Sequence, residues 1–320
     1  MSTKMNVKRL ALVATLTTLA GYASAKQLNM GGSTTSSSYY PYYTAVANSI
    51  SGADNGLNVT VVSTGGFSKN AQLLQSGQLD FAGLSPDLIQ DQIKKGNDNV
   101  RVLWWANPAI QTIVVRKDKK INDVMQLSEL CFHPGMTGSS SQKSMGMIMQ
   151  ALDLKPKKLH LSDSADAINA IKNGRCDAQV KSMSGKSLDA ATAELNLTTP
   201  VWPIGYTPEE QKKIKAQIPW MSFVTVPAGL VEGAPPYTTH ALWVGFGALK
   251  TMDEQTAYNI VKGMWSGIEA QQAALKGIKG IDVMQQTLDV SDYPLHAGAV
   301  RYYRERGLKV PDRLVPPEMK

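Results

Sequence analysis

Two short polar runs organise this sequence: Gly31-Gly32-Ser33-Thr34-Thr35-Ser36-Ser37-Ser38-Tyr39-Tyr40-Pro41 and Gly135-Met136-Thr137-Gly138-Ser139-Ser140-Ser141-Gln142. Each run follows an apolar stretch typical of a strand and precedes a stretch typical of a helix. A helix that begins there leaves up to four backbone N–H groups without partners and carries about half a positive charge at its start. Small side chains let a ligand approach those groups closely. Because the arrangement occurs twice, we expect one anionic ligand to be held between two lobes.

Strand-like and helix-like stretches alternate along most of the chain. In the first part the strands are expected at 28–30, 59–62 and 81–84, and the helices at 40–51, 67–75 and 87–95. A similar alternation follows, with strands at 131–132, 159–161 and 177–180 and helices at 139–152, 164–172 and 188–195. This order predicts a mostly parallel sheet, and its repetition predicts two such sheets. The stretches 102–105 and 112–115 predict two more strands.

The last third of the chain is interpreted as a return to the first lobe. It contains strand-like stretches at 223–226 and 240–246 and helix-like stretches at 253–271 and 297–306, after a capped helix expected from Thr207 to 217. We therefore predict a lobe 1 built from residues 26–115 and 221–320, with a lobe 2 of residues 116–220 inserted between them. Two crossing segments of this kind can act as a hinge, and a ligand belongs in the cleft beside them.

The N-terminus has the order of a secretory signal peptide. Lys4, Lys8 and Arg9 precede an apolar stretch that ends near residue 20, and Ala23-Ser24-Ala25 follows. We predict cleavage after Ala25 and export to the periplasm. Cleavage would lower the formal charge from +7 to +4, a mild excess that argues against nucleic acid as a partner.

The two cysteines leave a choice open. Cys131 and Cys176 each begin a predicted strand, and these strands could be neighbours. One disulfide in an oxidising compartment fits this pattern, and two unpaired buried thiols fit it nearly as well.

Motifs for bond-making chemistry are missing from the sequence. The four histidines lie far apart without metal-ligand spacing, and no G-x-S-x-G elbow occurs. Ser184-Gly185-Lys186-Ser187 imitates the end of a phosphate loop, but Val180 stands where that motif needs glycine. We expect no enzyme activity, no cofactor and no metal. An exported hydrolase with a less obvious catalytic constellation stays as an alternative.

The whole mature chain resembles the TAXI family of solute-binding proteins, which serve TRAP-type secondary transporters. The segments that carry this resemblance are Gly31-Gly32-Ser33, Tyr39-Tyr40-Pro41, Ser63-Thr64-Gly65-Gly66, Leu73-Leu74-Gln75-Ser76-Gly77-Gln78-Leu79-Asp80, Ser85-Pro86-Asp87, Val114-Val115-Arg116, 135–141, Ala228-Gly229 and Leu295-His296-Ala297-Gly298-Ala299-Val300-Arg301-Tyr302-Tyr303-Arg304-Glu305. The resemblance implies an α/β, two-lobed fold like that of type II periplasmic binding proteins. It also implies capture of a dicarboxylate or an acidic amino acid such as glutamate, and delivery to TRAP permease subunits. A sensory module that reports the solute to a membrane receptor is the alternative, and we expect a monomer.

Carried over to this sequence, the resemblance places the binding loops at 33–39, 64–66, 85–87 and 138–141. Lys181 is added because it follows a predicted strand of lobe 2 and so lies at the C-terminal edge of the sheet, where open α/β sheets bind ligands. Asp87 is interpreted as a helix cap, and of Trp104 and Trp105 we expect one in the core and one facing the cleft. The candidate ligand-binding residues are Ser33, Thr34, Thr35, Ser38, Tyr39, Thr64, Gly65, Gly66, Ser85, Gly138, Ser139, Ser140, Ser141 and Lys181.

Overall fold

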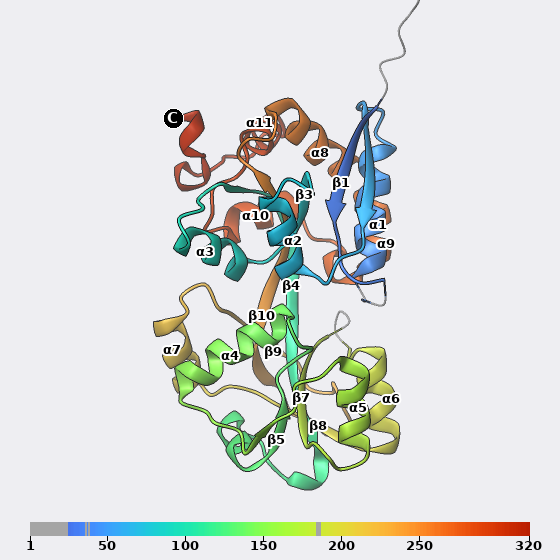
Figure 1. The fold of residues 1–320 in the computed structure, drawn as a ribbon, viewed down its shortest axis with the longest axis vertical. Coiled ribbons are helices and arrows are strands. Elements are labelled where there is room, and N and C mark those ends of the chain that lie inside the picture. The colour runs from blue at the N-terminus through green and yellow to red at the C-terminus, as the bar shows by residue number, and fades with distance from the viewer. Residues whose placement is uncertain (1–24, 36, 38, 184–186) are drawn as a thin grey trace, which may run out of the picture.

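The computed structural model describes residues 25–35, 37, 39–183 and 187–320. Figure 1 shows two lobes, one above the other, joined by the long strands β4 (Val100–Arg116) and β10 (Tyr237–Leu249). These two strands pair antiparallel along most of their length. β4 carries the chain out of the upper lobe and β10 brings it back, so a single continuous sheet passes through both lobes.

The upper lobe, lobe 1, contains the strand order β2-β1-β3-β10-β4. The strands β1 (Lys26–Gly31), β2 (Leu57–Val62) and β3 (Phe81–Leu84) are parallel, and β10 is antiparallel to β3. Helices cover this sheet: α1 (Tyr40–Ser51), α2 (Phe67–Gln75), α3 (Pro86–Lys94), α8 (Glu254–Ser266), α9 (Ile268–Ala274), α10 (Val283–Val290) and α11 (Ala297–Glu305).

The lower lobe, lobe 2, repeats the design around the other half of β4. The parallel strands are β5 (Cys131–His133), β6 (Lys158–Leu159) and β7 (Ala178–Ser182), while β8 (Val201–Ile204) pairs antiparallel with β4 and β9 (Ser222–Val226) with β10. Its helices are α4 (Ser140–Leu152), α5 (Ser164–Lys172), α6 (Ala190–Thr198) and α7 (Pro208–Gln217). β1, β2 and β3 are parallel to one another, and so are β5, β6 and β7, as predicted. The prediction of two mostly parallel sheets is corrected, because these strands belong to one mixed sheet with several antiparallel pairs. The antiparallel neighbours come from the crossing strands, which must run between the lobes in both directions.

Two sequence predictions about secondary structure are corrected. The stretches 102–105 and 112–115 are parts of one strand, β4. The helix expected over 253–271 is divided at Gly267 into α8 and α9, and a Cβ at Gly267 would collide with the side chain of Ser49 on α1. The capped start of α7 at Thr207 is confirmed, with its capping box formed by Glu210.

The hydrophobic core divides between the lobes. In lobe 1, Trp104 stacks on Phe246 with ring centroids 4.5 Å apart. Trp104 is 0% and Trp105 2% exposed, so the expectation that one of them faces the cleft is wrong. Separate clusters form in lobe 2 around Phe132 and around Ile171.

The predicted domain ranges remain a proposal, and the packing suggests one refinement. Phe223 lies after the predicted return at residue 221, yet its ring packs 5.6 Å from that of Tyr206 in the lobe 2 core. We propose to place the return crossing within β10.

The cysteines are joined. Cys131, at the start of β5, and Cys176, just before β7, form a disulfide with Cα atoms 4.8 Å apart. Of the two alternatives that the sequence left open, a disulfide or two unpaired thiols, the structure has the disulfide. Among the described helices, none combines the length and the apolar character that a membrane crossing requires.

Candidate ligand-binding cleft

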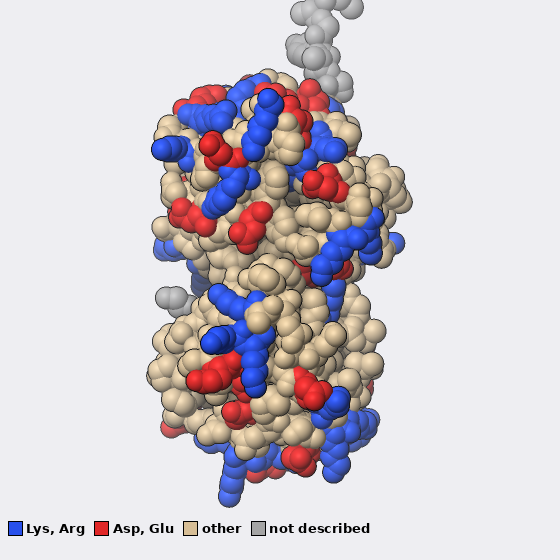
Figure 2. Space-filling model, turned by 90° about the vertical axis from the view of Figure 1, so that its left-hand side faces the viewer, with Lys and Arg blue, Asp and Glu red and all other residues tan. Residues whose placement is uncertain are grey.

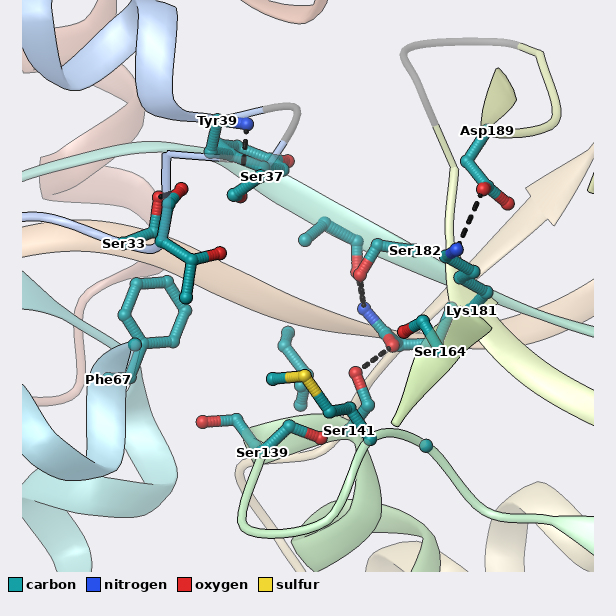
Figure 3. Close-up of a pocket in the computed structure, with 18 of the residues that line it drawn as sticks. Ser33, Ser37, Tyr39, Phe67, Ser139, Ser141, Ser164, Lys181, Ser182 and Asp189 are labelled. Carbon is teal, nitrogen blue, oxygen red and sulfur yellow. Dashed lines mark hydrogen bonds and ion pairs between the residues drawn. The ribbon is translucent and has the colours of Figure 1, made fainter. Parts of the chain in front are cut away.

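A cleft of about 820 Å³ lies between the two lobes, with the crossing strands at its base. Figure 3 shows the side chains that line it: Ser33, Ser37, Tyr39 and Phe67 come from lobe 1, and Ser139, Ser141, Ser164, Lys181, Ser182 and Asp189 from lobe 2. Ala109, Leu242 and Val244 of β4 and β10 complete the apolar part of the lining. A ligand in this cleft would touch both lobes at once.

Five helices begin at the cleft. The residues at the starts of α1, α2, α4, α5 and α6 all belong to its lining: Tyr39; Gly65, Gly66 and Phe67; Ser139, Ser140 and Ser141; Asp163, Ser164 and Ala165; and Asp189, Ala190 and Ala191. Each helix start brings unpaired N–H groups and a partial positive charge. The convergence of five of them makes the cleft a favourable place for an anion.

The helix starts of the two lobes differ in their caps. In lobe 2, the side chains of Ser139, Asp163 and Asp189 each accept a hydrogen bond from a backbone N–H of the first turn. In lobe 1, no side chain caps α1 or α2. The start of α2 requires glycine, because Gly66 has φ +100°. At α1, Tyr40 N–H donates to Ser37 O and Pro41 has no N–H, so the uncapped N–H groups that lobe 1 offers a ligand lie mainly at the start of α2.

Gln111 of β4 forms a polar network at the base of the cleft. Its Nε2 donates to Ala109 O (3.0 Å) and to Ser182 Oγ (2.8 Å), and its Oε1 accepts from Ser141 Oγ (2.7 Å). The Gln111 side chain is buried, whereas both serines are partly exposed to the cleft. Two cleft hydroxyls from different elements of lobe 2 are thus held by one amide.

Lys181 is the cationic side chain among the described lining residues, and its ammonium group already forms an ion pair. Its Nζ lies 3.0 Å from Oδ1 of Asp189, the residue that caps α6. It stands next to the last residue of β7, at the strand edge where the sequence predicted it. A ligand anion would compete with Asp189 for this ammonium group.

The Tyr39 hydroxyl lies at the lobe 1 side of the cleft. It accepts a hydrogen bond from Asn107 Nδ2 at 3.2 Å. Burial raises the pKa of Tyr39 to about 12, although the Asn107 bond acts in the opposite direction. The hydroxyl therefore keeps its proton at neutral pH.

Nine predicted site residues are brought together in the cleft: Ser33, Thr34, Tyr39, Gly65, Gly66, Ser139, Ser140, Ser141 and Lys181. Thr35 and Gly138 are exposed and lie outside the lining, and Ser38 is not among the described residues.

Thr64 and Ser85 are buried behind the cleft wall instead of lining it. Thr64 Oγ1 lies 2.7 Å from Asn70 Oδ1 and accepts from Gly66 N–H, and Ser85 Oγ donates to Asp87. These bonds shape the loops from behind. Whether any of the fourteen residues binds ligand stays a prediction.

A pair of acidic residues on α3 connects the lobes. Lys143 of α4 in lobe 2 contacts Asp91, and its Nζ lies 3.6 Å from Oδ2 of Asp87. Burial raises the pKa of Asp87, while the bond from Ser85 and the charge of Lys143 lower it. Asp87 is not the cap of α3, because that position belongs to Ser85 and no side-chain cap bond forms. The carboxyl that was interpreted as a cap is thus part of an ion pair between lobes.

Several lining residues were missed by sequence reasoning. The starts of α5 and α6 at Asp163 and Asp189 follow predicted strands, so the argument used for the two polar runs would have found them. Gln111, Ser182 and Leu242 carried no such signal. Among the described residues, no group of three or more His, Cys, Asp or Glu side chains could hold a metal ion.

Comparison with known proteins gives a family match and several structural neighbours. Residues 30–307 match the sequence model of the NMT1-like family. The chain is similar to the periplasmic sulfonate-binding protein SsuA from Methylobacillus flagellatus KT, with a TM-score of 0.53 and 13% identity over 92% of both chains. It is also similar to a protein from Bordetella bronchiseptica RB50, with a TM-score of 0.52 and 16% identity over 92% of this chain and 86% of that one.

A third neighbour is a Candida albicans gene product described as having the generic periplasmic binding protein structural fold. Its TM-score is 0.50 with 13% identity, over 88% of this chain and 80% of that one. At such low identities these likenesses concern the fold. The chain has the α/β, two-lobed fold of periplasmic binding proteins.

Proposed function

The chain belongs to the NMT1-like family, and on that premise we propose that it captures a small organic anion in the cleft between its lobes. The anion is a dicarboxylate or an acidic amino acid such as glutamate. The captured solute is delivered to the permease subunits of a TRAP-type transporter, as the resemblance to TAXI receptors implies. The protein acts in the periplasm as a monomer and makes or breaks no bond in its ligand.

The observation that carries this proposal is the convergence of five helix starts on one cleft. Backbone N–H groups and helix dipoles favour negative charge without a dedicated arginine. The cleft is large enough for a small ligand, and residues of both lobes line it. Figure 2 shows that basic and acidic side chains are interspersed on one outer face of the molecule.

Binding is coupled to closure of the lobes. Residues of both lobes line the cleft, so a ligand gains its full set of contacts only when the lobes are close. A ligand can shift the balance between open and closed forms only through contacts that differ between them. The closed form is then the one that the permease recognises.

The first test is a thermal-shift screen of the chain that begins at Lys26. The panel holds C4 and C5 dicarboxylates, acidic amino acids, keto acids, alkyl sulfonates and neutral controls, because a ligand that binds only the folded state raises Tm. We expect shifts with carboxylates and none with neutral compounds. If no compound of the panel raises the Tm of ligand-free, refolded protein, the proposal is contradicted. A rise in Tm with sulfonates alone would change the proposed ligand class.

A matched pair of variants tests the site. Ser140 Oγ is buried at the start of α4 and has no hydrogen-bond partner among the described residues, so it is available to a ligand. Ser140→Ala should weaken binding roughly tenfold, the value of one hydrogen bond to a charged group, and leave the ligand-free Tm unchanged. Ser144→Ala is the control, because Ser144 lies on the same helix outside the lining and donates to Ser141 O. Equal affinity in the Ser140 variant and wild type would count against α4 as an anion-binding wall.

The energy source for uptake distinguishes the two types of transporter. With the cognate permease in membrane vesicles, a TRAP-type system should take up the bound solute in response to a sodium gradient. Uptake that requires ATP instead would assign the protein to an ABC transporter.

A further inference from the structure

The polar groups of the Gln111 side chain are all paired, and their directions can be assigned. The amide is 1% exposed and reaches Ala109 O, Ser182 Oγ and Ser141 Oγ. A backbone carbonyl can only accept a hydrogen bond, so the nitrogen of the amide must be the atom that faces Ala109. The oxygen of the amide then faces Ser141, and the second N–H faces Ser182.

This orientation gives the two cleft serines opposite roles. Ser141 must donate its proton to Gln111 Oε1, which leaves its oxygen lone pairs for a partner in the cleft. Ser182 accepts the amide N–H, which leaves its own proton to be donated. Figure 3 shows this chain of bonds from Ser182 through the amide to Ser141, at the lobe 2 side of the cleft. The cleft therefore presents a fixed acceptor and a fixed donor side by side.

The network is held in place from both sides. The backbone of Gln111 pairs with that of Ser182 in the β4·β7 register, and Thr239 of β10 donates to Gln111 O at 2.5 Å. Thr239 is fully buried. These bonds fix the backbone of Gln111, and the contact with Ala109 O fixes its amide. Rotation of the amide by half a turn would set Oε1 against this carbonyl oxygen, so the two serines do not exchange roles.

We propose that Gln111 is a specificity-determining, positioning residue that selects acids with a hydroxyl or amino group close to the carboxylate. The carboxylate accepts from Ser182 beside Lys181, and the neighbouring hydroxyl or ammonium group donates to Ser141. An acid without that group would leave the Ser141 oxygen unpaired, which costs affinity. This inference rests on the proposed capture of an organic anion.

The test compares matched acids by calorimetry: L-malate with succinate, L-glutamate with glutarate, and lactate with propionate. Within the pair that binds, wild type should prefer the member with the extra donor by about tenfold or more, the effect of one hydrogen bond. Ser141→Ala should bring this ratio close to one. Ser182→Ala should weaken both members and keep the ratio.

Gln111→Leu removes the amide and should also lower the ratio, because both hydroxyls can then rotate. Its control is Gln179→Leu, since Gln179 is an equally buried glutamine on neighbouring β7 that donates to Thr192 and does not line the cleft. That control should cost stability without changing the ratio. If Gln111→Leu does not fold, the serine variants decide.

The outcomes separate the two proposals. Equal affinity of wild type for both members of every binding pair, or an equal loss for both members in Ser141→Ala, overturns the role of Gln111 and leaves anion capture standing. No binding of any acid overturns anion capture and this inference with it.

Discussion

The disulfide should account for a large share of the stability of lobe 2. Cys131 and Cys176 are 45 residues apart in sequence. A cross-link that closes a loop of this length lowers the entropy of the unfolded chain, and the loop-closure relation gives about 4 kcal/mol at 25 °C. Both cysteines are buried in the cluster with Ile171 and Val201, so the bond acts within lobe 2. We expect Cys131→Ala/Cys176→Ala to lose about 4 kcal/mol of unfolding free energy.

The assay is urea unfolding followed by far-UV circular dichroism and tryptophan fluorescence, with oxidised wild type as the reference. Wild type unfolded in a reductant is the control, because it keeps both sulfur atoms and lacks only the bond. The difference between reduced wild type and the double variant isolates the packing of the two sulfurs. A loss below about 1 kcal/mol in both comparisons would refute the loop-closure reasoning.

Two further predictions concern charges. Lys143→Met removes the ion pair between the lobes, so it should increase the radius of gyration of the ligand-free protein in small-angle scattering. It should also weaken ligand binding about fivefold, or roughly 1 kcal/mol, the value for a partly exposed pair. The control Lys155→Met breaks a pair within lobe 2 and should change neither quantity, and an unchanged radius in the Lys143 variant would contradict the prediction. Burial lowers the pKa of His240 to about 3, against 6.5 in the unfolded chain. Between these values the unfolded state binds the extra proton, so the free energy of unfolding decreases as the pH is lowered, by about 2 kcal/mol from pH 7 to pH 5. His240→Asn should flatten this dependence in urea unfolding at the two pH values, and equal slopes would refute it.

Much of the fold follows from local signals in the sequence. Apolar stretches of strand length followed by capped helix starts are local, and the predicted helix over 67–75 and strand over 81–84 have the bounds of α2 and β3. The sequence predicts two strands, 102–105 and 112–115, where the structure has the single strand β4. Asn107-Pro108 lies between the two stretches, and proline normally interrupts a strand. The structure keeps β4 continuous there because Pro108 lies opposite Trp243 of β10, next to a shift of register. That compensation comes from a strand more than a hundred residues away and has no local signal.

The same division applies to the cleft. Ser139 is predictable because a helix start is visible in a few consecutive residues, whereas Gly66 is predicted through the resemblance to TAXI receptors. Gln111 and Val244 line the cleft because of the way two crossing strands are paired and bent, so their neighbours are set by tertiary structure. Thr64 and Ser85 have the right residue type at the right loop, but bonds to Asn70 and Asp87 turn them away from the cleft.

The interrupted layout of lobe 1 has a consequence for the order of folding. β3 ends at Leu84, and the segment of β10 that pairs with it begins at Gly245. As the chain leaves the ribosome, or any pore that passes it N-terminus first, lobe 2 is synthesised in one piece while the β3 edge still waits for its partner. Unpaired strand edges invite association with other chains until they are covered. The sheet of lobe 1 closes last, and a nascent chain that stops before β10 leaves this edge open to a chaperone or to aggregation.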